Sequence, residues 1–189
     1  MNHPILDQTF ENQNFSGKKL LAKEYDNCTF ANCDFTEANM SVVTFLECTF
    51  DTCNFGATML KETSFQEVIF KDCKMLGSDF TSCNDFMFSV RFDHCNLEYS
   101  SFSGFAMKNT MFTSCSLKEV DFTDTDITGS VFADCNLKNA IFENTIAENV
   151  DFRTAKHFII DPEKNRLKKA KFSTTGLEGL LRKYNLNIE

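Results

Sequence analysis

The sequence has no tryptophan and only seven glycines among its 189 residues. It also lacks any apolar stretch of the ~18–20 residues that a membrane-spanning helix needs. The glycines form no phosphate-binding loop, so nucleotide-binding motifs of that kind are excluded. Residues 1–4 (Met-Asn-His-Pro) do not begin a signal peptide. We therefore expect a cytoplasmic protein that does not associate with membranes.

Catalytic and metal-binding motifs are missing as well. The three histidines, His3, His94 and His157, have no nucleophile at a suitable spacing. The C-x₄-C pairs among the nine cysteines follow the five-residue spacing described below, not the two tight pairs of a zinc site. We expect no enzyme activity, no cofactor and no metal, and we expect the cysteines to be buried free thiols.

The net charge of −8 is unevenly distributed along the chain. The first 157 residues contain 23 Asp and Glu against 12 Lys and Arg, whereas the last 32 contain 4 against 7. Direct binding to nucleic acid needs Lys and Arg over the phosphates, so the acidic body argues against it. The acidity is explained either by the solubility of a large exposed surface or by imitation of the phosphate charge of a duplex.

Large apolar residues recur every five residues through Cys115–Phe152, each preceded two places earlier by a small residue. They are Leu117, Phe122, Ile127, Phe132, Leu137, Phe142 and Phe152. A five-residue step would scatter these side chains around an α-helix and send alternate ones to opposite faces of a strand. The chain must therefore turn a corner every five residues, so that each large residue points to a common axis.

Two columns of identical residues indicate that four corners complete one coil. The phenylalanines from Phe10 to Phe70 are spaced by 20, Phe92 follows after 22, and the spacing of 20 then resumes. The cysteines from Cys33 to Cys135 repeat the same spacings, including the gap of 22. A fixed period of about 20 residues is typical of a solenoid. The common gap predicts a two-residue insertion within residues 84–89, where either Phe86 or Met87 would take the central position.

The pattern of a small residue, Asp or Asn, and a large apolar residue resembles the pentapeptide-repeat family. The matching triplets are Cys33-Asp34-Phe35, Ala38-Asn39-Met40, Cys53-Asn54-Phe55, Ser78-Asp79-Phe80, Cys95-Asn96-Leu97, Val120-Asp121-Phe122, Cys135-Asn136-Leu137 and Val150-Asp151-Phe152. The resemblance implies an all-β solenoid, a right-handed quadrilateral β-helix, which we expect over residues 1–157. The Asp and Asn side chains would serve the corners by hydrogen bonding to the backbone.

Both ends of the repeat are expected to differ from its middle. Polar residues occupy the small-residue positions of the first coil, as an end that faces water requires; these are Gln8, Gln13, Lys18 and Lys23. Residues 158–189 form an appendage with a turn at Asp161–Asn165, a last triplet ending at Phe172, and a short helix. Thr175 and Glu178 have the spacing of a capping box at the start of that helix.

The C-terminal helix has one apolar face, because its large residues are spaced by three and four. We expect this face to cover the end of the solenoid and, with the residues that follow, to join two chains as a homodimer. The predicted interface consists of Leu177, Leu180, Leu181, Tyr184, Leu186 and Ile188. The family resemblance supports the same arrangement.

Within the family, the chain resembles the Qnr and MfpA branch in its length, its nearly unbroken coils and its C-terminal helix. Those relatives bind type II topoisomerases, chiefly DNA gyrase, as mimics of double-stranded DNA, and can confer quinolone resistance. The resemblance implies DNA gyrase or topoisomerase IV as the partner. Two rods of ~36 Å joined end to end would be comparable to ~20 base pairs of duplex. The chain departs from loop-bearing Qnr proteins because only two residues are inserted, which weakens the implication of drug protection.

The residues predicted to imitate DNA are acidic residues that lie close together in the later repeats. They are Glu119, Asp121, Asp124, Asp126, Asp134 and Asp151. The alternative is a general protein-interaction rod with another partner. Its apolar patch would contain Ile69, Met111 and Val131, which fall in one outward column, unless these are isolated surface residues.

Overall fold

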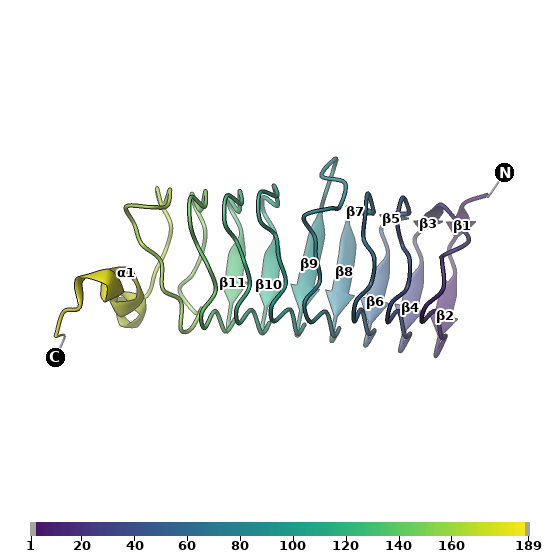
Figure 1. Cartoon of the computed structure of the whole chain (residues 1–189), viewed down its shortest axis with the longest axis horizontal. Coiled ribbons are helices and arrows are strands. Elements are labelled where there is room, and N and C mark those ends of the chain that lie inside the picture. Colours follow the sequence, from purple (N-terminus) through teal and green to yellow (C-terminus); the bar gives the residue numbers. More distant parts are fainter. Residues whose placement is uncertain (1–2, 188–189) are drawn as a thin grey trace.

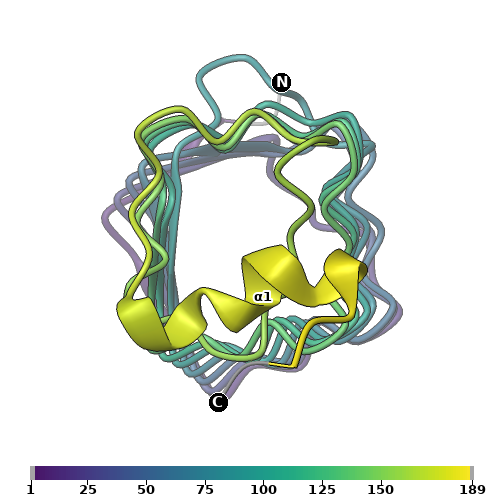
Figure 2. The same ribbon diagram turned by 90° about the vertical axis from the view of Figure 1, so that its left-hand side faces the viewer.

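The computed structural model describes residues 3–187 of the chain, which forms a four-sided tube of stacked coils (Figures 1 and 2). All strands pair in parallel with the coil before or after them. The predicted right-handed quadrilateral β-helix is therefore confirmed. Among the described residues, the one α-helix is far too short to cross a membrane.

Two of the four sides carry β-sheets. The four-stranded side contains β1 (Ile5–Leu6), β3 (Glu24–Asp26), β5 (Thr44–Leu46) and β7 (Ser64–Gln66). The seven-stranded side contains β2 (Thr9–Glu11), β4 (Thr29–Ala31), β6 (Thr49–Asp51), β8 (Val68–Lys71), β9 (Val90–Asp93), β10 (Met111–Thr113) and β11 (Val131–Ala133).

The other two sides are held by isolated parallel bridges. The Asn14 side follows the seven-stranded side along the chain and begins with the bridge Asn14–Asp34. The Lys19 side comes next and begins with the bridge Lys19–Asn39. These four names are used below for the four surfaces of the rod.

The strand register confirms both the period and the insertion. Phe50 pairs with Phe70, 20 residues on, whereas Phe70 pairs with Phe92, 22 residues on. Asn84 still bridges to Ser64 at the shorter interval, and Val90 already pairs with Val68 at the longer one. The extra residues therefore lie within 84–89, as predicted.

Phenyl rings fill the interior of the tube. The ring of Phe112, for example, stacks on those of Phe92 and Phe132 at centroid distances of 5.1 and 4.9 Å, with 10° between the planes. Rings on neighbouring sides meet edge to face, as Phe112 and Phe122 do at 6.4 Å. Such pairs add ~0.5–1.5 kcal/mol to the burial of apolar area. The aromatic content of the sequence is thus explained by the core.

The Asp and Asn residues before the central position close the corners, as predicted. Asp34 Oδ1 accepts hydrogen bonds from the amide and the hydroxyl of Thr36 at 3.0 and 2.6 Å. The next residue, Glu37, has φ +57°, a left-handed conformation that favours Gly, Asn and Asp over other residues. These local hydrogen bonds help to hold a strained corner in every coil.

All nine cysteines are free and buried, as predicted, and most of them follow a side that carries a sheet. On the Asn14 side the carbonyl of the central residue receives an amide three residues later, as Phe35 O does from Ala38 at 2.9 Å. On the seven-stranded side a thiol from the next coil takes this role: Cys53 Sγ donates to Phe30 O at 3.2 Å and Cys73 Sγ to Phe50 O at 3.3 Å. Burial raises the pKa of Cys48 to about 12, so that this thiol stays protonated and can donate.

The cysteine column can be tested by substitution at Cys73. Cys73→Ala removes the donor to Phe50 O, so it should lower the free energy of unfolding by about 1–3 kcal/mol. Cys73→Ser is the matched control, because a hydroxyl can still donate, and it should cost less than about 1 kcal/mol. Urea denaturation followed by circular dichroism measures both. Equal losses for the two variants would show that the hydrogen bond does not explain the cysteine.

The first coil closes its own open edge. Gln13 Nε2 donates to Glu11 O at 2.9 Å, and Lys18 Nζ donates to Asn14 O at 2.7 Å. One coil later, the matching carbonyls of Ala31 and Asp34 accept amides from the preceding coil. The polar residues in these small-residue positions therefore replace hydrogen bonds that a missing coil would make, and they protect an edge that could pair with another chain.

The C-terminal end is covered by a segment that lies across the mouth of the tube (Figure 2). The predicted last triplet is confirmed, because Lys171 bridges to Asp151 and the ring of Phe172 stacks on Phe152 at 5.3 Å. The segment that follows consists of η1 (Thr174–Gly176), α1 (Glu178–Leu181) and η2 (Arg182–Tyr184).

The predicted capping box is wrong. The side chains at the starts of η1 and α1 make no capping hydrogen bond. The chain enters α1 through the 3₁₀ turn η1, which follows Ser173, and the Thr175 hydroxyl pairs with that of Ser173 at 3.1 Å. Thr175 therefore lies inside the 3₁₀ turn and does not precede a regular helix.

Candidate protein-binding surfaces

The six acidic residues predicted for partner binding do not share one side of the rod. Glu119 and Asp124 lie at the two corners of the Lys19 side, with φ of +57° and +54°, and Asp121 lies between them. Asp126 belongs to the four-stranded side, where it bridges to Ala106. Asp134 and Asp151 border or lie on the seven-stranded side. The first four thus run across the rod within one coil, and the other two are separate.

Several of these carboxylates are engaged within the chain. Asp151 accepts hydrogen bonds from Arg153, with Nη2 and Oδ2 2.7 Å apart, and this contact lowers the pKa of Asp151 although partial burial opposes the change. Burial tends to raise the pKa of Asp126, but Thr128 and Lys108, 3.1 Å away, outweigh it and lower that pKa. These two carboxylates are charged but partly neutralised.

Acidic residues form two longer rows along the edges of the seven-stranded side. The first acidic row borders the four-stranded side and contains Asp7, Asp26, Glu47 and Glu67. The second acidic row borders the Asn14 side and contains Glu11, Asp51, Asp72 and Asp93. Thr9, Thr29 and Thr49 lie in register between the rows. Members on successive coils are about 4.8 Å apart along the rod.

The two rows differ in how far they are neutralised. In the second row, Asp51 pairs with Lys71 at 3.3 Å and Asp93 with His94 at 2.9 Å. Within residues 3–187, no member of the first row forms an ion pair with a Lys or Arg. The first acidic row therefore offers the less compensated negative charge. Analysis of the sequence missed it because its members are one coil apart in the chain.

The insertion forms a small projecting loop, residues 84–89, beside the first acidic row (Figures 1 and 2). Neither Phe86 nor Met87 takes the central position, as we had predicted; their side chains are 68% and 63% exposed. Phe88 packs against the core instead, with its ring 4.8 Å from that of Phe105. The turn closed by Phe88 N and Asp85 O, 3.3 Å apart, places Phe86 and Met87 at its tip, which explains the difference.

The predicted dimer residues divide into two groups. Leu180 packs against the core and Leu181 is half-buried, whereas Leu177, Tyr184 and Leu186 are 45–58% exposed. Lys183 Nζ contacts Asp161 and Glu163 at 2.6 and 2.7 Å and holds the segment in place. Ile188 lies outside the described residues. The segment covers the tube and leaves an apolar surface exposed, and the dimer stays a prediction.

Residues 3–187 contain no group of three or more His, Cys, Asp and Glu side chains arranged to hold a metal ion. The largest grooves lie elsewhere on the surface. One, of about 700 Å³, is beneath the C-terminal segment and is lined by Lys156, Phe158 and Arg182 among others. The other, of about 910 Å³, is beside the loop of residues 84–89. The features that remain for function are therefore exposed surfaces.

Comparison with known proteins agrees with this architecture. A sequence profile of the pentapeptide repeat region matches residues 23–102 and 85–152. The chain belongs to the pentapeptide-repeat family. Comparison with curated proteins gives no significant sequence match to this pentapeptide-repeat protein.

Solved structures share the fold of this pentapeptide-repeat protein. One trypsin-treated variant of QnrB1, a plasmid-mediated fluoroquinolone resistance protein, is 16% identical with a TM-score of 0.57, covering 98% of this chain and 97% of its own. A second such variant is 18% identical with a TM-score of 0.51, covering 98% and 99%. HetL from Nostoc, involved in heterocyst differentiation regulation, is 14% identical with a TM-score of 0.42, covering 88% and 86%.

Proposed function

We propose that this protein is a non-enzymatic rod that binds a type II topoisomerase, DNA gyrase or topoisomerase IV, by presenting the charge pattern of duplex DNA. The pentapeptide-repeat fold supports a protein-interaction role. The observation that carries the proposal is the pair of acidic rows along the two edges of the seven-stranded side. The enzyme surface that normally receives DNA would receive this side of the rod.

The charge density of the rows is compatible with imitation of DNA. A duplex carries one phosphate charge per ~1.7 Å of axis, in two rows that flank a groove. The eight acids of the two rows occupy five successive coils, which corresponds to one charge per ~3 Å at the spacing of stacked strands. The rod thus offers roughly half the charge of a duplex in a similar two-row arrangement, separated by a flat sheet.

Two further features are consistent with this proposal. The fold similarity extends over nearly the whole length of QnrB1, a fluoroquinolone resistance protein, and fluoroquinolones act on type II topoisomerases. The predicted residues Glu119, Asp121, Asp124 and Asp126 supply a second acidic surface on and beside the Lys19 side. Asp134 lies in line with Asp72 of the second acidic row, and Asp151 lies on the seven-stranded side itself.

We also propose a homodimer through the C-terminal segment. Leu177, Tyr184 and Leu186 expose apolar surface there, and Leu180, Leu181 and Ile188 would complete the contact. Joining two rods at this end doubles the length of the acidic surface. The dimer would thereby approach the length of duplex that a topoisomerase binds.

The proposal predicts that the purified protein inhibits supercoiling by DNA gyrase at micromolar concentration, and that Glu47→Lys with Glu67→Lys weakens inhibition about tenfold, because complementary charges guide and strengthen association. Glu119→Lys with Asp124→Lys is the matched control, with the same change of charge on another side. A parallel assay with a quinolone measures drug protection. No inhibition by the unchanged protein would contradict the proposal, and a loss confined to the control pair would move the binding surface to the Lys19 side.

A second candidate is a rod that binds a different protein through apolar contacts. It is favoured by the exposed Phe86 and Met87, since a turn tip ordinarily carries Gly, Asn or Asp. The same supercoiling assay separates the two candidates, because a rod with another partner would leave gyrase unaffected.

A further inference from the structure

The loop of residues 84–89 is an unusual place for large apolar side chains. Phe86 and Met87 are the middle residues of its turn, and Met87 has φ +57°. Turn tips favour Gly, Asn, Asp and Ser, each of which fits such a backbone at lower cost. Phe86 is 68% exposed and Met87 63% exposed, so neither contributes to the core of the protein. Their exposure therefore needs an explanation outside the fold.

The loop forms one wall of a groove of about 910 Å³ on the edge between the four-stranded and seven-stranded sides. Its apolar lining comes from successive coils and includes Leu46, Ile69, Met87, Phe88 and Met111. Ile69 and Met111 were two members of the outward apolar column seen in the sequence. They lie on either side of Arg91 in the sheet register, and the Arg91 guanidinium lies 3.3 Å from Met111 Sδ. The groove is therefore wide enough and apolar enough to hold a large side chain.

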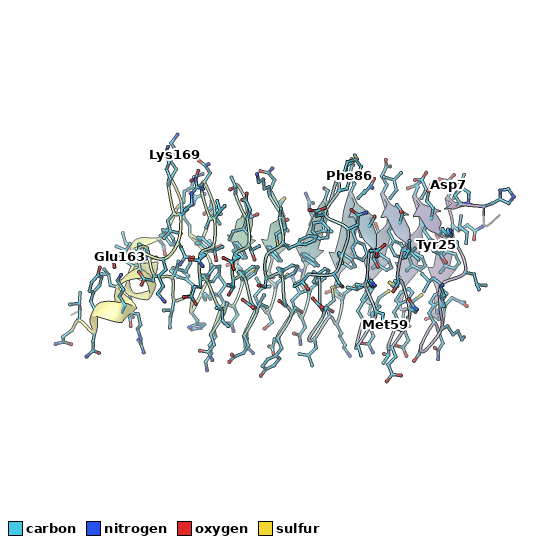
Figure 3. The ribbon with its side chains drawn as sticks, turned by 45° about the horizontal axis from the view of Figure 1, so that its top comes forward. Asp7, Tyr25, Met59, Phe86, Glu163 and Lys169 are labelled. Carbon is cyan, nitrogen blue, oxygen red and sulfur yellow. The ribbon has the colours of Figure 1, made fainter. Side chains whose placement is uncertain are left out.

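Charge along this edge is polarised. The first acidic row reaches the groove from the N-terminal end, and its last member, Glu67, lines the groove together with Asp85. Arg91 and Lys108 line the groove toward the C-terminal end. Farther along, Lys168 and Lys169 are exposed, and Figure 3 places Asp7, Phe86 and Lys169 along the same margin of the rod. The edge thus runs from acidic, through apolar, to basic.

We propose that this edge binds an extended, basic segment of a partner protein. One large apolar side chain of the segment would enter the groove against Phe86 and Met87, and its Lys or Arg residues would lie over Glu67, Glu47, Asp26 and Asp7. Charge complementarity selects this occupant, since no Lys or Arg of residues 3–187 pairs with the first acidic row. Three coil spacings of ~4.8 Å correspond to about five residues of extended chain at ~3.3 Å each.

This inference rests on the proposed binding role and names the chemistry of the segment that would be recognised. Apolar anchors in well-packed pockets usually supply most of the affinity at an interface, whereas peripheral charges guide association and orientation. The groove would therefore provide the anchor and the first acidic row the direction. A second copy of this chain or a purely electrostatic contact would make different use of the same residues, and the experiment below distinguishes them.

The test uses the full chain and a fluorescein-labelled decapeptide with one leucine near its start and lysines at alternate later positions. We expect saturable binding by fluorescence polarisation, weakened about tenfold by Phe86→Ser with Met87→Ser and about tenfold by Glu47→Lys with Glu67→Lys. Replacing the peptide's leucine by serine should weaken binding to the unchanged protein by a similar factor. Circular dichroism and melting temperature establish that the variants remain folded, as expected for changes at exposed positions.

The controls decide whether the groove is responsible. Glu119→Lys with Asp124→Lys should leave binding within about twofold, because these residues lie on another side. Equal loss in this control, or full affinity in the loop variant, would overturn the inference in favour of unspecific charge attraction. Self-association of the chain that disappears with Phe86→Ser in sedimentation velocity would also overturn it, in favour of a second copy. Peptide binding without inhibition of gyrase would refute the topoisomerase proposal alone, and inhibition without peptide binding would refute this inference alone.

Discussion

Phe112→Ala is expected to lower the free energy of unfolding by about 3–5 kcal/mol, the range of large core truncations. The Phe112 side chain is fully buried, and its ring lies between those of Phe92 and Phe132. The backbone of β10 is paired with β9 on one side and β11 on the other. Because these hydrogen bonds fix the spacing of the coils, the walls cannot move inward to fill the cavity. Denaturant unfolding followed by circular dichroism measures the loss.

Met111→Ala is the matched control for this prediction. Met111 precedes Phe112 on β10 but points outward and is 39% exposed. Its truncation should change the stability by no more than about 0.5 kcal/mol, as at other surface positions. Similar losses for the two variants would show that stability does not depend on which side of the wall a residue occupies, and would contradict the account of the core.

Gly179→Val is expected to release the C-terminal segment from the end of the tube. A β-carbon at Gly179 would overlap the backbone oxygen of Phe158 and lie within 2.9 Å of its ring. The amide of Ile160 also donates to Gly179 O at 3.1 Å, so the two backbones meet directly. Displacement would expose Phe158, Phe172 and Leu180, at a cost of about 2–4 kcal/mol in lost apolar burial. Limited trypsin digestion should then cleave at Arg182 and Lys183 at least about tenfold faster.

The control for this experiment is Gly56→Ala at a corner of the Asn14 side. A β-carbon there meets no atom closer than 3.6 Å, which is an ordinary contact, so digestion and stability should remain nearly unchanged. Size-exclusion chromatography of Gly179→Val adds a second measurement, because an uncovered coil end can pair with another chain. Unchanged digestion together with an unchanged elution volume would contradict the role of this segment as a cover.

The fold could be predicted because a single physical requirement acts on every coil. Each fifth residue must point inward, so the period appears in the sequence as the columns from Phe10 to Phe152 and from Cys33 to Cys135. Those columns also placed the insertion, since a change in register shifts all later members together. The structure adds why cysteine is used: the thiols of Cys53 and Cys73 bond to carbonyls of the preceding coil.

The candidate binding surfaces were harder to predict, because surface residues do not have to repeat. The predicted acids Glu119 to Asp126 are neighbours in the chain, but five residues cross one whole side of the tube. The first acidic row is assembled from residues one coil apart and emerges only when the coils are stacked. Phe88 was missed as the central residue of the insertion because Phe86, Met87 and Phe88 are all large and apolar. The choice among them depends on the geometry of the turn.

The insertion of residues 84–89 has a consequence for how such proteins can diversify. Asn84 keeps the spacing of the coils before it and Val90 that of the coils after it, so the extra length is absorbed at one corner. Neighbouring rungs are joined edge to edge and receive no strain from the added segment. A corner can therefore accept a cassette of new residues while the rest of the scaffold stays intact. Longer recognition elements grafted at this point should alter what the rod contacts without altering how it folds.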